Sequence, residues 1–249
     1  MNNTLQTIFN HRSIRKFTKE KLTTEQIYTI VRGAQKASTS NYMMAYTIIG
    51  IDDEETKEKL ATITGQTYVK DNGHFFIFCA DLHRVYNQAS KTVQEKMQVN
   101  MENTEQFIVA TVDTALAAQN AAIAAESIGL GVCFIGSIRN DIKRVDEILQ
   151  LPQYVIPLFG LAVGYPDQKP EQKPRLPLDV VYHENKYDHN LEQIKRLISE
   201  FDQQIRSYYQ KRSTNTRTNT WTEQMIRKYC EEVRMDITQF VKDKGYNKH

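Results

Sequence analysis

Hydrophobic and polar positions alternate in blocks along the chain, and four short blocks are rich in β-branched and aromatic residues. They predict strands over residues 46–51, 74–80, 132–135 and 155–163. The segments between them favour helices, including 84–100, 104–128 and 140–149. This alternation is typical of a layered domain in which helices cover a sheet, although it does not give the strand directions.

Helical periodicity also marks the two ends of the chain. Residues 4–10 suggest a short helix, and Thr23 and Gln26 have capping-box spacing in front of a second one. Beyond residue 164 the chain changes character. A proline-rich and polar excursion over 165–190 precedes a helix at about 190–210, a polar loop over 211–220, and a last amphipathic helix from Trp221 almost to the end.

The longest apolar stretch, residues 107–130, contains Asp113, Gln119, Asn120 and Glu126, which would be costly inside a bilayer. We expect a helix buried in a core or at a subunit interface, and no membrane partner. The net charge of +2 gives no strong field for nucleic acid. Three dispersed cysteines and an N-terminus without a basic and then apolar leader indicate a reducing, cytoplasmic location.

Three basic segments are candidate anion sites. Residues 11–15 read HRSIR, residues 173–177 read KPRLP, and Arg212 and Arg217 lie in the polar loop. Arginines spaced by three residues, with a hydroxyl between them, can present donors to one phosphate. Each segment alone is better explained as a solvated basic surface. Two rigid basic elements far apart in the sequence make an anion site more plausible than either does singly.

The glycine-rich run 129–137 superficially resembles a dinucleotide-binding loop. Here, however, a helix precedes the glycines and a strand follows, whereas the dinucleotide fingerprint needs the opposite order. We instead predict a helix C-cap at Gly129 or Gly131. The strand then ends at Gly136 and Ser137, where small side chains let a flat ligand approach the backbone.

No nucleophile, acid–base set or metal-ligand spacing stands out among the side chains. The sequence has no HExxH, GxSxG or Walker A pattern, and its six histidines are dispersed. A binding site without a catalytic side chain indicates that a cofactor performs the chemistry.

Taken in order, these segments resemble the nitroreductase family, in particular its NADPH-dependent flavin reductases and oxygen-insensitive nitroreductases of low-GC Gram-positive bacteria. The resemblance covers essentially the whole chain, including the tail around Arg212, Arg217, Thr220 and Trp221. It is carried by HRSIRKF at 11–17, ASTS at 37–40, GQTYV at 65–69, AQN at 118–120, AAES at 124–127, IGSIRN at 135–140, LFGL at 158–161, KPRLP at 173–177 and HEN at 183–185.

The resemblance implies an α+β, three-layer fold with a central, mainly antiparallel sheet flanked by helices. It also implies an intertwined homodimer with FMN at the subunit interface. Residues 1–164 would form the FMN-binding core. Residues 165–249 would form a C-terminal excursion and arm that contacts the partner subunit and NADPH, within one continuous domain. The helix over 107–130 would lie at the interface.

The resemblance also assigns roles residue by residue. Arginines near the phosphate, hydroxyls near the ribityl chain and backbone groups along the flavin would bind FMN, with Ser38, Thr39 and Ser40 reaching it from the other subunit. Arg212 and Arg217 match positions that hold the 2′-phosphate of NADPH. The full expected FMN set is His11, Arg12, Ser13, Arg15, Ser38, Thr39, Ser40, Gln66, Tyr68, Ile135, Gly136, Ser137, Lys173 and Arg175.

The implied activity is an NADPH oxidoreductase that passes hydride through flavin N5, by ping-pong kinetics, to small acceptors such as quinones, nitroaromatics or free flavin. Two alternatives stay open: a dedicated flavin reductase that releases reduced FMN, and a flavin-binding sensor without turnover. Met44 stands where many relatives carry glutamine, and Ser137 where glycine is frequent. We expect both to be compatible with flavin binding, while the physiological acceptor and the preference for NADPH over NADH stay undetermined.

Overall fold

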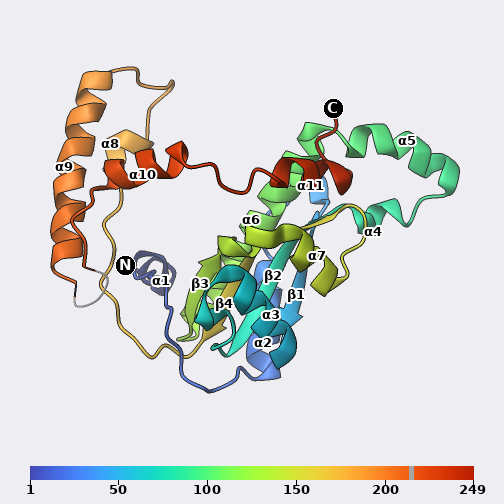
Figure 1. The fold of residues 1–249 in the computed structure, drawn as a ribbon, viewed down its shortest axis with the longest axis horizontal. Helices are drawn as coiled ribbons and strands as arrows, with labels where there is room; N and C mark the ends of the chain where they lie inside the picture. Colours follow the sequence, from blue (N-terminus) through green and yellow to red (C-terminus); the bar gives the residue numbers. More distant parts are fainter. Residues whose placement is uncertain (213–215) are drawn as a thin grey trace. The chain divides into compact units, whose positions relative to one another are not determined.

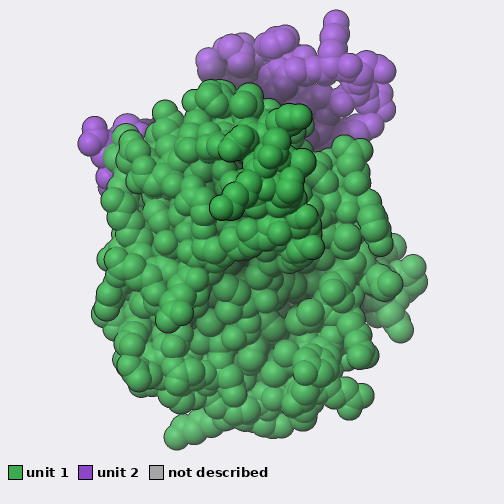
Figure 2. All heavy atoms as spheres, turned by 90° about the vertical axis from the view of Figure 1, so that its right-hand side faces the viewer, with its two compact units in different colours: residues 1–170, 234–249 green, residues 171–233 purple. Residues whose placement is uncertain are grey.

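The structure is a computed structural model that describes residues 1–212 and 216–249. The described chain forms two compact units, coloured separately in Figure 2. The first unit contains Met1–Pro170 and Arg234–His249, and the second contains Glu171–Val233. The chain therefore leaves the first unit after Pro170 and returns to it near the C-terminus. Residues 213–215 of the predicted polar loop lie outside the described residues.

A four-stranded antiparallel sheet lies at the centre of the first unit (Figure 1). Its strands run in the order β1-β2-β4-β3, and every neighbouring pair is antiparallel. The two central strands are buried along nearly their whole length, which explains their almost continuous apolar sequence. All four predicted strands are confirmed, as β1 (Tyr46–Ile51), β2 (His74–Asp81), β3 (Gly131–Ile135) and β4 (Val155–Gly164).

Side chains alternate between two hydrophobic clusters on opposite faces of the sheet. Phe76 and Phe78 of β2 pack with residues of α2 (Thr24–Ala34) and α6 (Thr104–Ser127). Phe75 and Ile77 pack on the other face with residues of α3 (Glu54–Thr64) and α7 (Ile142–Leu149). This period of two confirms the three-layer arrangement that the sequence predicted. The short α1 (Asn3–Phe9) precedes these layers in sequence.

Helix α6 packs closely because its inner face is made largely of alanine. A Cβ atom on Gly33 of α2 would lie 2.7 Å from the Cβ of Ala124, so glycine is needed at this crossing. Helix α6 is long and apolar enough to cross a membrane. Its alanines, however, pack in the core cluster on the sheet face that carries Phe76 and Phe78. The helix ends before Gly129, whose φ of +84° confirms a C-cap there.

Three predicted helices are wrong in detail. Segment 84–100 is two helices, α4 (His83–Tyr86) and α5 (Lys91–Met101), because the chain turns before Ser90 and starts α5 there. Segment 140–149 begins as a 3-10 turn, Gly136–Asp141, before α7. The last helix is also two, α10 (Trp221–Cys230) and α11 (Ile237–Asp243). Between them Arg234 takes a φ of +59° and donates to Asn140 Oδ1 at 2.7 Å and 3.1 Å.

The second unit has its own small apolar cluster. Phe201, Ile205 and Tyr209 recur at every fourth position of α9 (Leu191–Gln210), so they share one buried face. Trp221, at the start of α10, packs edge-on to Phe201 with ring centres 6.2 Å apart. The excursion before α9 is extended, as predicted, apart from the single turn of α8 (Leu178–Val181).

A buried histidine lies at the start of β2. His74 is 5% exposed, neither ring nitrogen has a hydrogen-bond partner within the described residues, and its ring contacts the edge of Phe76. Burial, together with the nearby cations Lys57 and Lys21, lowers the pKa of His74 to about 4, while the carboxylate of Asp52 opposes this shift. The histidine is therefore neutral in the folded protein near neutral pH.

This pKa predicts how stability depends on pH. Between pH 6.5 and 4 His74 is protonated in the unfolded chain but neutral in the folded chain. The free energy of unfolding therefore falls as the pH falls through this range. The loss amounts to about 3 kcal/mol. Urea unfolding of the wild type and of His74→Gln at several pH values measures it. The variant should lose less stability on acidification, and parallel curves for the two proteins would contradict the prediction.

Candidate functional site

The first basic segment is fixed along the edge strand β3. Ser13 forms a parallel bridge with Val132, and the Ile14 amide donates to the Val132 carbonyl at 2.8 Å. The buried side chains of Ile14 and Phe17 anchor the segment, while Arg15 between them is exposed. A Cβ on Gly131 would lie 2.7 Å from Ile14 Cγ1, so this glycine admits the close approach.

The cations of this segment differ in their partners. His11 Nδ1 lies 2.8 Å from Glu126 Oε1 of α6, which fixes the imidazole. Arg12 donates to the carbonyls of Asn10 at 3.2 Å and Pro170 at 3.3 Å. Within the described chain neither Arg12 nor Arg15 forms an ion pair with a carboxylate. Both guanidinium groups therefore keep their charge available for an anion.

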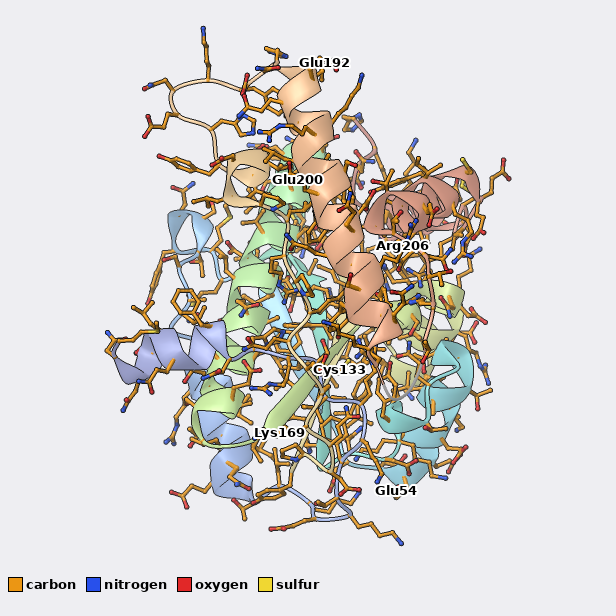
Figure 3. All side chains as sticks on the ribbon, turned by 90° about the vertical axis from the view of Figure 1, so that its left-hand side faces the viewer. Glu54, Cys133, Lys169, Glu192, Glu200 and Arg206 are labelled. Atoms are coloured by element: carbon orange, nitrogen blue, oxygen red, sulfur yellow. The ribbon has the colours of Figure 1, made fainter. Side chains whose placement is uncertain are left out.

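Tyr68 and Cys133 lie beside this segment. Burial raises the pKa of the Tyr68 hydroxyl, Cys133 adds to the rise, and the nearby Arg15 cation opposes it. Burial likewise raises the pKa of the Cys133 thiol, with Arg15, Tyr68 and Ser13 acting in the opposite direction. Cys133 is labelled on β3 in Figure 3. Since a protonated thiol is a weak nucleophile, this cysteine packs in the site without supplying chemistry.

Two other predicted flavin residues carry unsatisfied polar atoms. Gln66 Oε1 and Ser137 Oγ are buried without a hydrogen-bond partner among the described residues. An unpaired buried polar atom costs about 1–3 kcal/mol, so such atoms call for a ligand or water. Asn140 donates to the Ile63 carbonyl at 3.3 Å, which joins the turn containing Ser137 to the end of α3, just before Gln66.

Gly136, directly after β3, has a half-buried cation behind it. A Cβ at this position would lie 3.3 Å from Arg139 Nη2, and Arg139 also donates to the Leu158 carbonyl. Burial lowers the pKa of Arg139, and the neighbouring Arg234 lowers it further. With Ile135 buried on its inner side, the backbone of 135–137 forms a surface with little side-chain cover.

Asp113 of α6 fixes the Ser38–Ser40 segment through hydrogen bonds to the backbone. The Asp113 carboxylate accepts from the Ser40 amide at 2.9 Å and from the Ala45 amide at 3.1 Å. Asn41, Tyr42 and Met44 between them all have positive φ. In this single chain, no hydrogen bond or ion pair between described residues joins Ser38–Ser40 to the His11–Arg15 segment.

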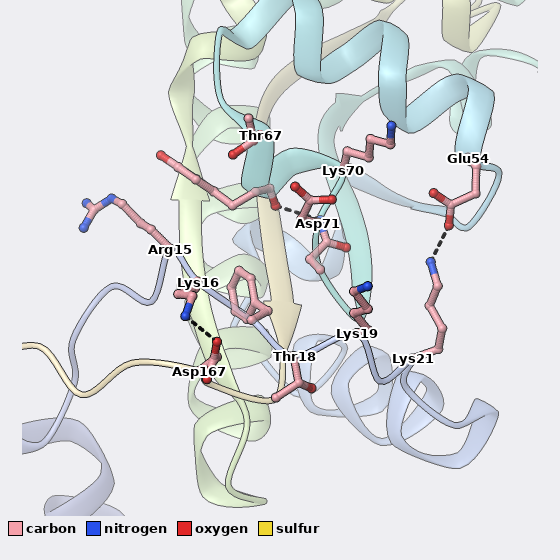
Figure 4. Close-up of a pocket in the computed structure, with 13 residues that line it drawn as sticks. Arg15, Lys16, Thr18, Lys19, Lys21, Glu54, Thr67, Lys70, Asp71 and Asp167 are labelled. Atoms are coloured by element: carbon pink, nitrogen blue, oxygen red, sulfur yellow. Dashed lines mark hydrogen bonds and ion pairs between the residues drawn. The ribbon is translucent and has the colours of Figure 1, made fainter.

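A cavity of about 830 Å³ opens in the first unit beside Arg15, Thr67 and Tyr68 (Figure 4). Its cations are mostly neutralised: Lys16 pairs with Asp167 at 2.6 Å, Lys21 with Glu54, and Lys70 with Glu58. The cavity includes only Arg15 and Tyr68 of the predicted FMN set, and Gln66 lines a separate hollow of about 270 Å³. Each of these two cavities therefore contains only part of the predicted site.

The remaining predicted residues lie in the second unit. Lys173 and Arg175 are exposed on the extended excursion, and Arg217 is exposed after the end of α9. Lys173, Arg212 and Arg217 come together around Tyr209. Tyr209 and Asp113 were missed by the sequence reasoning as site residues. The sequence offered one signal for each residue. Asp113 is a carboxylate in an otherwise apolar helix, and Tyr209 ends an apolar stripe just before Arg212.

The arrangement suits binding of a phosphorylated, planar ligand. Unpaired guanidinium groups offer donors to phosphate, the 135–137 backbone admits a flat ring, and Gln66 and Ser137 present polar atoms that need partners. FMN has these chemical groups, so the residues present fit it.

Comparisons with known proteins agree with this geometry. A family model described as "Nitroreductase family" matches residues 8–165, and one described as "Nitroreductase family, C-terminal domain" matches residues 173–249. The chain is 49% identical to the FMN reductase (NADPH) of Bacillus subtilis over 250 residues, covering 100% of both proteins.

Solved structures are equally similar. A nitroreductase from B. subtilis, 48% identical, superposes with a TM-score of 0.95 over 99% of this chain and 100% of that chain. The NADPH:FMN oxidoreductase of Vibrio harveyi, complexed with NAD+, is 39% identical with a TM-score of 0.87 and covers 100% of both chains.

The two hydrogen bonds to Asp113 predict a large effect of its removal. Asp113→Ala leaves the amides of Ser40 and Ala45 without an acceptor, so the free energy of unfolding should fall by roughly 2–4 kcal/mol. Asp113→Asn, which retains one acceptor, should lose less. Urea unfolding at pH 7 measures both. Glu105→Ala, at an exposed carboxylate of the same helix, is the matched control and should cost less than about 1 kcal/mol. Equal losses at the two sites would contradict the role of Asp113.

Proposed function

The chain belongs to the nitroreductase family, and from this premise we propose that it is an FMN-dependent NADPH oxidoreductase. One observation carries the proposal. The residues that the family resemblance assigned to FMN include the buried, unpartnered atoms Gln66 Oε1 and Ser137 Oγ and the unpaired cations Arg12 and Arg15. A bound flavin would supply partners to both kinds of group.

Bound FMN supplies a centre that accepts hydride from a nicotinamide and then reduces a small acceptor such as a quinone, a nitroaromatic or free flavin. The protein residues bind and orient. Arg12 and Arg15 hold the phosphate side together with Ser13, and the pairing of their segment with β3 reduces the entropy lost on binding. Gln66, Tyr68 and the 135–137 backbone hold the ring system.

Charge near the ring system is also part of the proposal. Arg139 lies directly behind Gly136 and has no carboxylate partner among the described residues. A half-buried cation at this place favours negative charge on a ligand against the 135–137 backbone. Lys173 and Arg175 of the second unit are proposed as further FMN contacts. His11, held by Glu126, completes the basic end of the site.

The proposal includes a second copy of the chain. Ile108, Val112 and Leu116, spaced by four residues on α6, are 51%, 49% and 43% exposed. Leu5, Ile8 and Phe9 of α1 add apolar exposed surface in the same unit. An exposed apolar stripe on a long helix is typical of an interface. In a homodimer, Ser38, Thr39 and Ser40 would reach the flavin bound to the partner subunit.

Arg212 and Arg217 are proposed to bind the 2′-phosphate of NADPH. A charge-assisted hydrogen bond contributes about 1.5–3 kcal/mol, so Arg212→Ala with Arg217→Ala should raise the KM for NADPH at least about tenfold. The KM for NADH, which lacks this phosphate, should change less than about threefold. Lys195→Ala, on the exposed face of α9, is the control and should change neither. Equal small effects on both coenzymes would remove the assignment.

The dimer makes a separate prediction. Val112→Asp places a charge in the exposed α6 stripe, where a partner would have to desolvate it, so the variant should be monomeric and retain less FMN after gel filtration. Light scattering coupled to gel filtration measures the mass, and the flavin absorbance of the peak measures the cofactor. Lys143→Asp, at an exposed position of α7 on the opposite face of the sheet, tests the effect of charge outside this stripe. A wild-type monomer that holds FMN fully would contradict the shared site.

A further inference from the structure

Tyr209 lies at the end of the buried face of α9, in its last turn. Figure 3 shows the helix through the labels Glu192, Glu200 and Arg206, which precede Tyr209 in sequence. The tyrosine is 1% exposed and packs in the cluster with Phe201 and Ile205. Its ring thus has a fixed position, set by the only apolar cluster found in the described part of the second unit.

Three cations from two segments surround this one ring: Lys173 from the extended excursion, and Arg212 and Arg217 from the loop after α9. The Arg217 guanidinium lies 4.0 Å from the ring centre, and its Nη2 donates to the Tyr209 hydroxyl at 2.8 Å. The Lys173 ammonium lies 5.4 Å and the Arg212 guanidinium 5.9 Å from the same centre. All three distances are within reach of a cation–π interaction, and Arg217 also has the hydrogen bond.

These cations lack the partners that clustered charges usually have. None of Lys173, Arg212 and Arg217 forms an ion pair with a carboxylate in the described ranges 1–212 and 216–249. Like charges that gather without counter-charge repel one another, so something must offset the repulsion. The ring face and the phenolic oxygen of Tyr209 do so in the structure, and an anion would add to them.

The hydroxyl itself reflects this environment. Burial raises the pKa of Tyr209, but the nearby cations Lys173 and Arg217 outweigh burial, so the net pKa lies below its ordinary value. The direction of this shift reflects the two cations placed beside the phenolic oxygen. One further contact ties the same loop to α9, where Arg206 Nε donates to the Thr218 carbonyl at 3.2 Å. Within the loop, Thr216 Oγ1 donates to the Arg212 carbonyl at 3.1 Å.

We propose that Tyr209 is the positioning residue of the coenzyme-phosphate site: its hydroxyl and ring hold Arg217, with Arg212 and Lys173 around it, in the arrangement that selects a 2′-phosphorylated dinucleotide. This inference rests on the proposed function of Arg212 and Arg217 and adds the residue that organises them. A long guanidinium side chain on an exposed loop loses much conformational freedom when it binds phosphate. Holding it in place beforehand removes part of that cost.

The test separates the hydroxyl from the ring. Tyr209→Phe keeps the ring in the apolar cluster and removes the oxygen that accepts from Arg217. We expect adenosine 2′,5′-bisphosphate, used as the probe, to bind the FMN-loaded protein about three- to tenfold more weakly by calorimetry. Adenosine 5′-monophosphate should bind as before, because it lacks the 2′-phosphate. In steady state the ratio of kcat/KM for NADPH to that for NADH should fall by a similar factor.

Tyr229→Phe is the matched control, because Tyr229 lies on α10 of the same unit and is 85% exposed. This change should alter neither probe. Thermal unfolding of Tyr209→Phe checks that the cluster is intact. Should that variant unfold, Arg217→Lys serves instead, since it retains the charge but loses the guanidinium geometry over the ring, and it should weaken the bisphosphate selectively.

A double-mutant cycle identifies the route of the effect. If Tyr209 acts through Arg217, Tyr209→Phe should have little further effect on bisphosphate binding once Arg217 is alanine. Additive effects, or equal weakening of both nucleotides, would overturn the positioning role. The outcomes also separate the two proposals. Loss of selectivity in the arginine variants with an unaltered Tyr209→Phe overturns only this inference. Arginine variants that leave selectivity unchanged overturn the coenzyme assignment itself.

Discussion

The close approach of the first basic segment to the edge strand β3 is the constraint on which the site depends. One amide of Ile14 pairs with Val132, the side chain of Ile14 is buried against Gly131, and the exposed cation Arg15 follows directly. An edge strand has unpaired backbone groups, and here part of that edge is used to fix a ligand-binding segment. Because Gly136 and Ser137 follow directly after this strand, β3 orders both the phosphate side and the ring side of the proposed flavin site.

Much of the fold was predictable because its signals are local. The four strands are short apolar blocks bounded by turns, and the α2 capping box and the Gly129 C-cap are written in a few adjacent residues. The errors occur where a tertiary contact overrides local periodicity. The last helix is interrupted at Arg234, whose side chain binds Asn140 far away in sequence. Helical pattern over 221–243 carries no sign of that contact, so the sequence predicted one helix where there are two.

Less of the candidate site than of the fold was predictable from local sequence patterns. Family resemblance named the FMN and NADPH residues, and the geometry of each unit is compatible with those roles without testing them. The sequence could not reveal that Gln66 Oε1 and Ser137 Oγ are buried without partners, since burial of one atom depends on packing from several elements. Nor could it reveal that Lys173, Arg212 and Arg217 share one aromatic ring, because Lys173 is far in sequence from the loop that contains the two arginines. Asp113 and Tyr209, which hold other site residues in place, belong to none of the recognised motifs, so the sequence did not predict their roles.

The most direct test of the account is anaerobic stopped-flow spectroscopy of the FMN-loaded protein mixed with NADPH and, separately, with NADH. The flavin's visible absorbance reports its oxidation state. The account predicts rapid bleaching by NADPH, slower bleaching by NADH at equal concentration, and recovery of the absorbance when a quinone or nitroaromatic is added. A protein that binds FMN but stays oxidised with both coenzymes would contradict it and favour a flavin-binding sensor without turnover. A protein that binds no FMN would contradict the site itself.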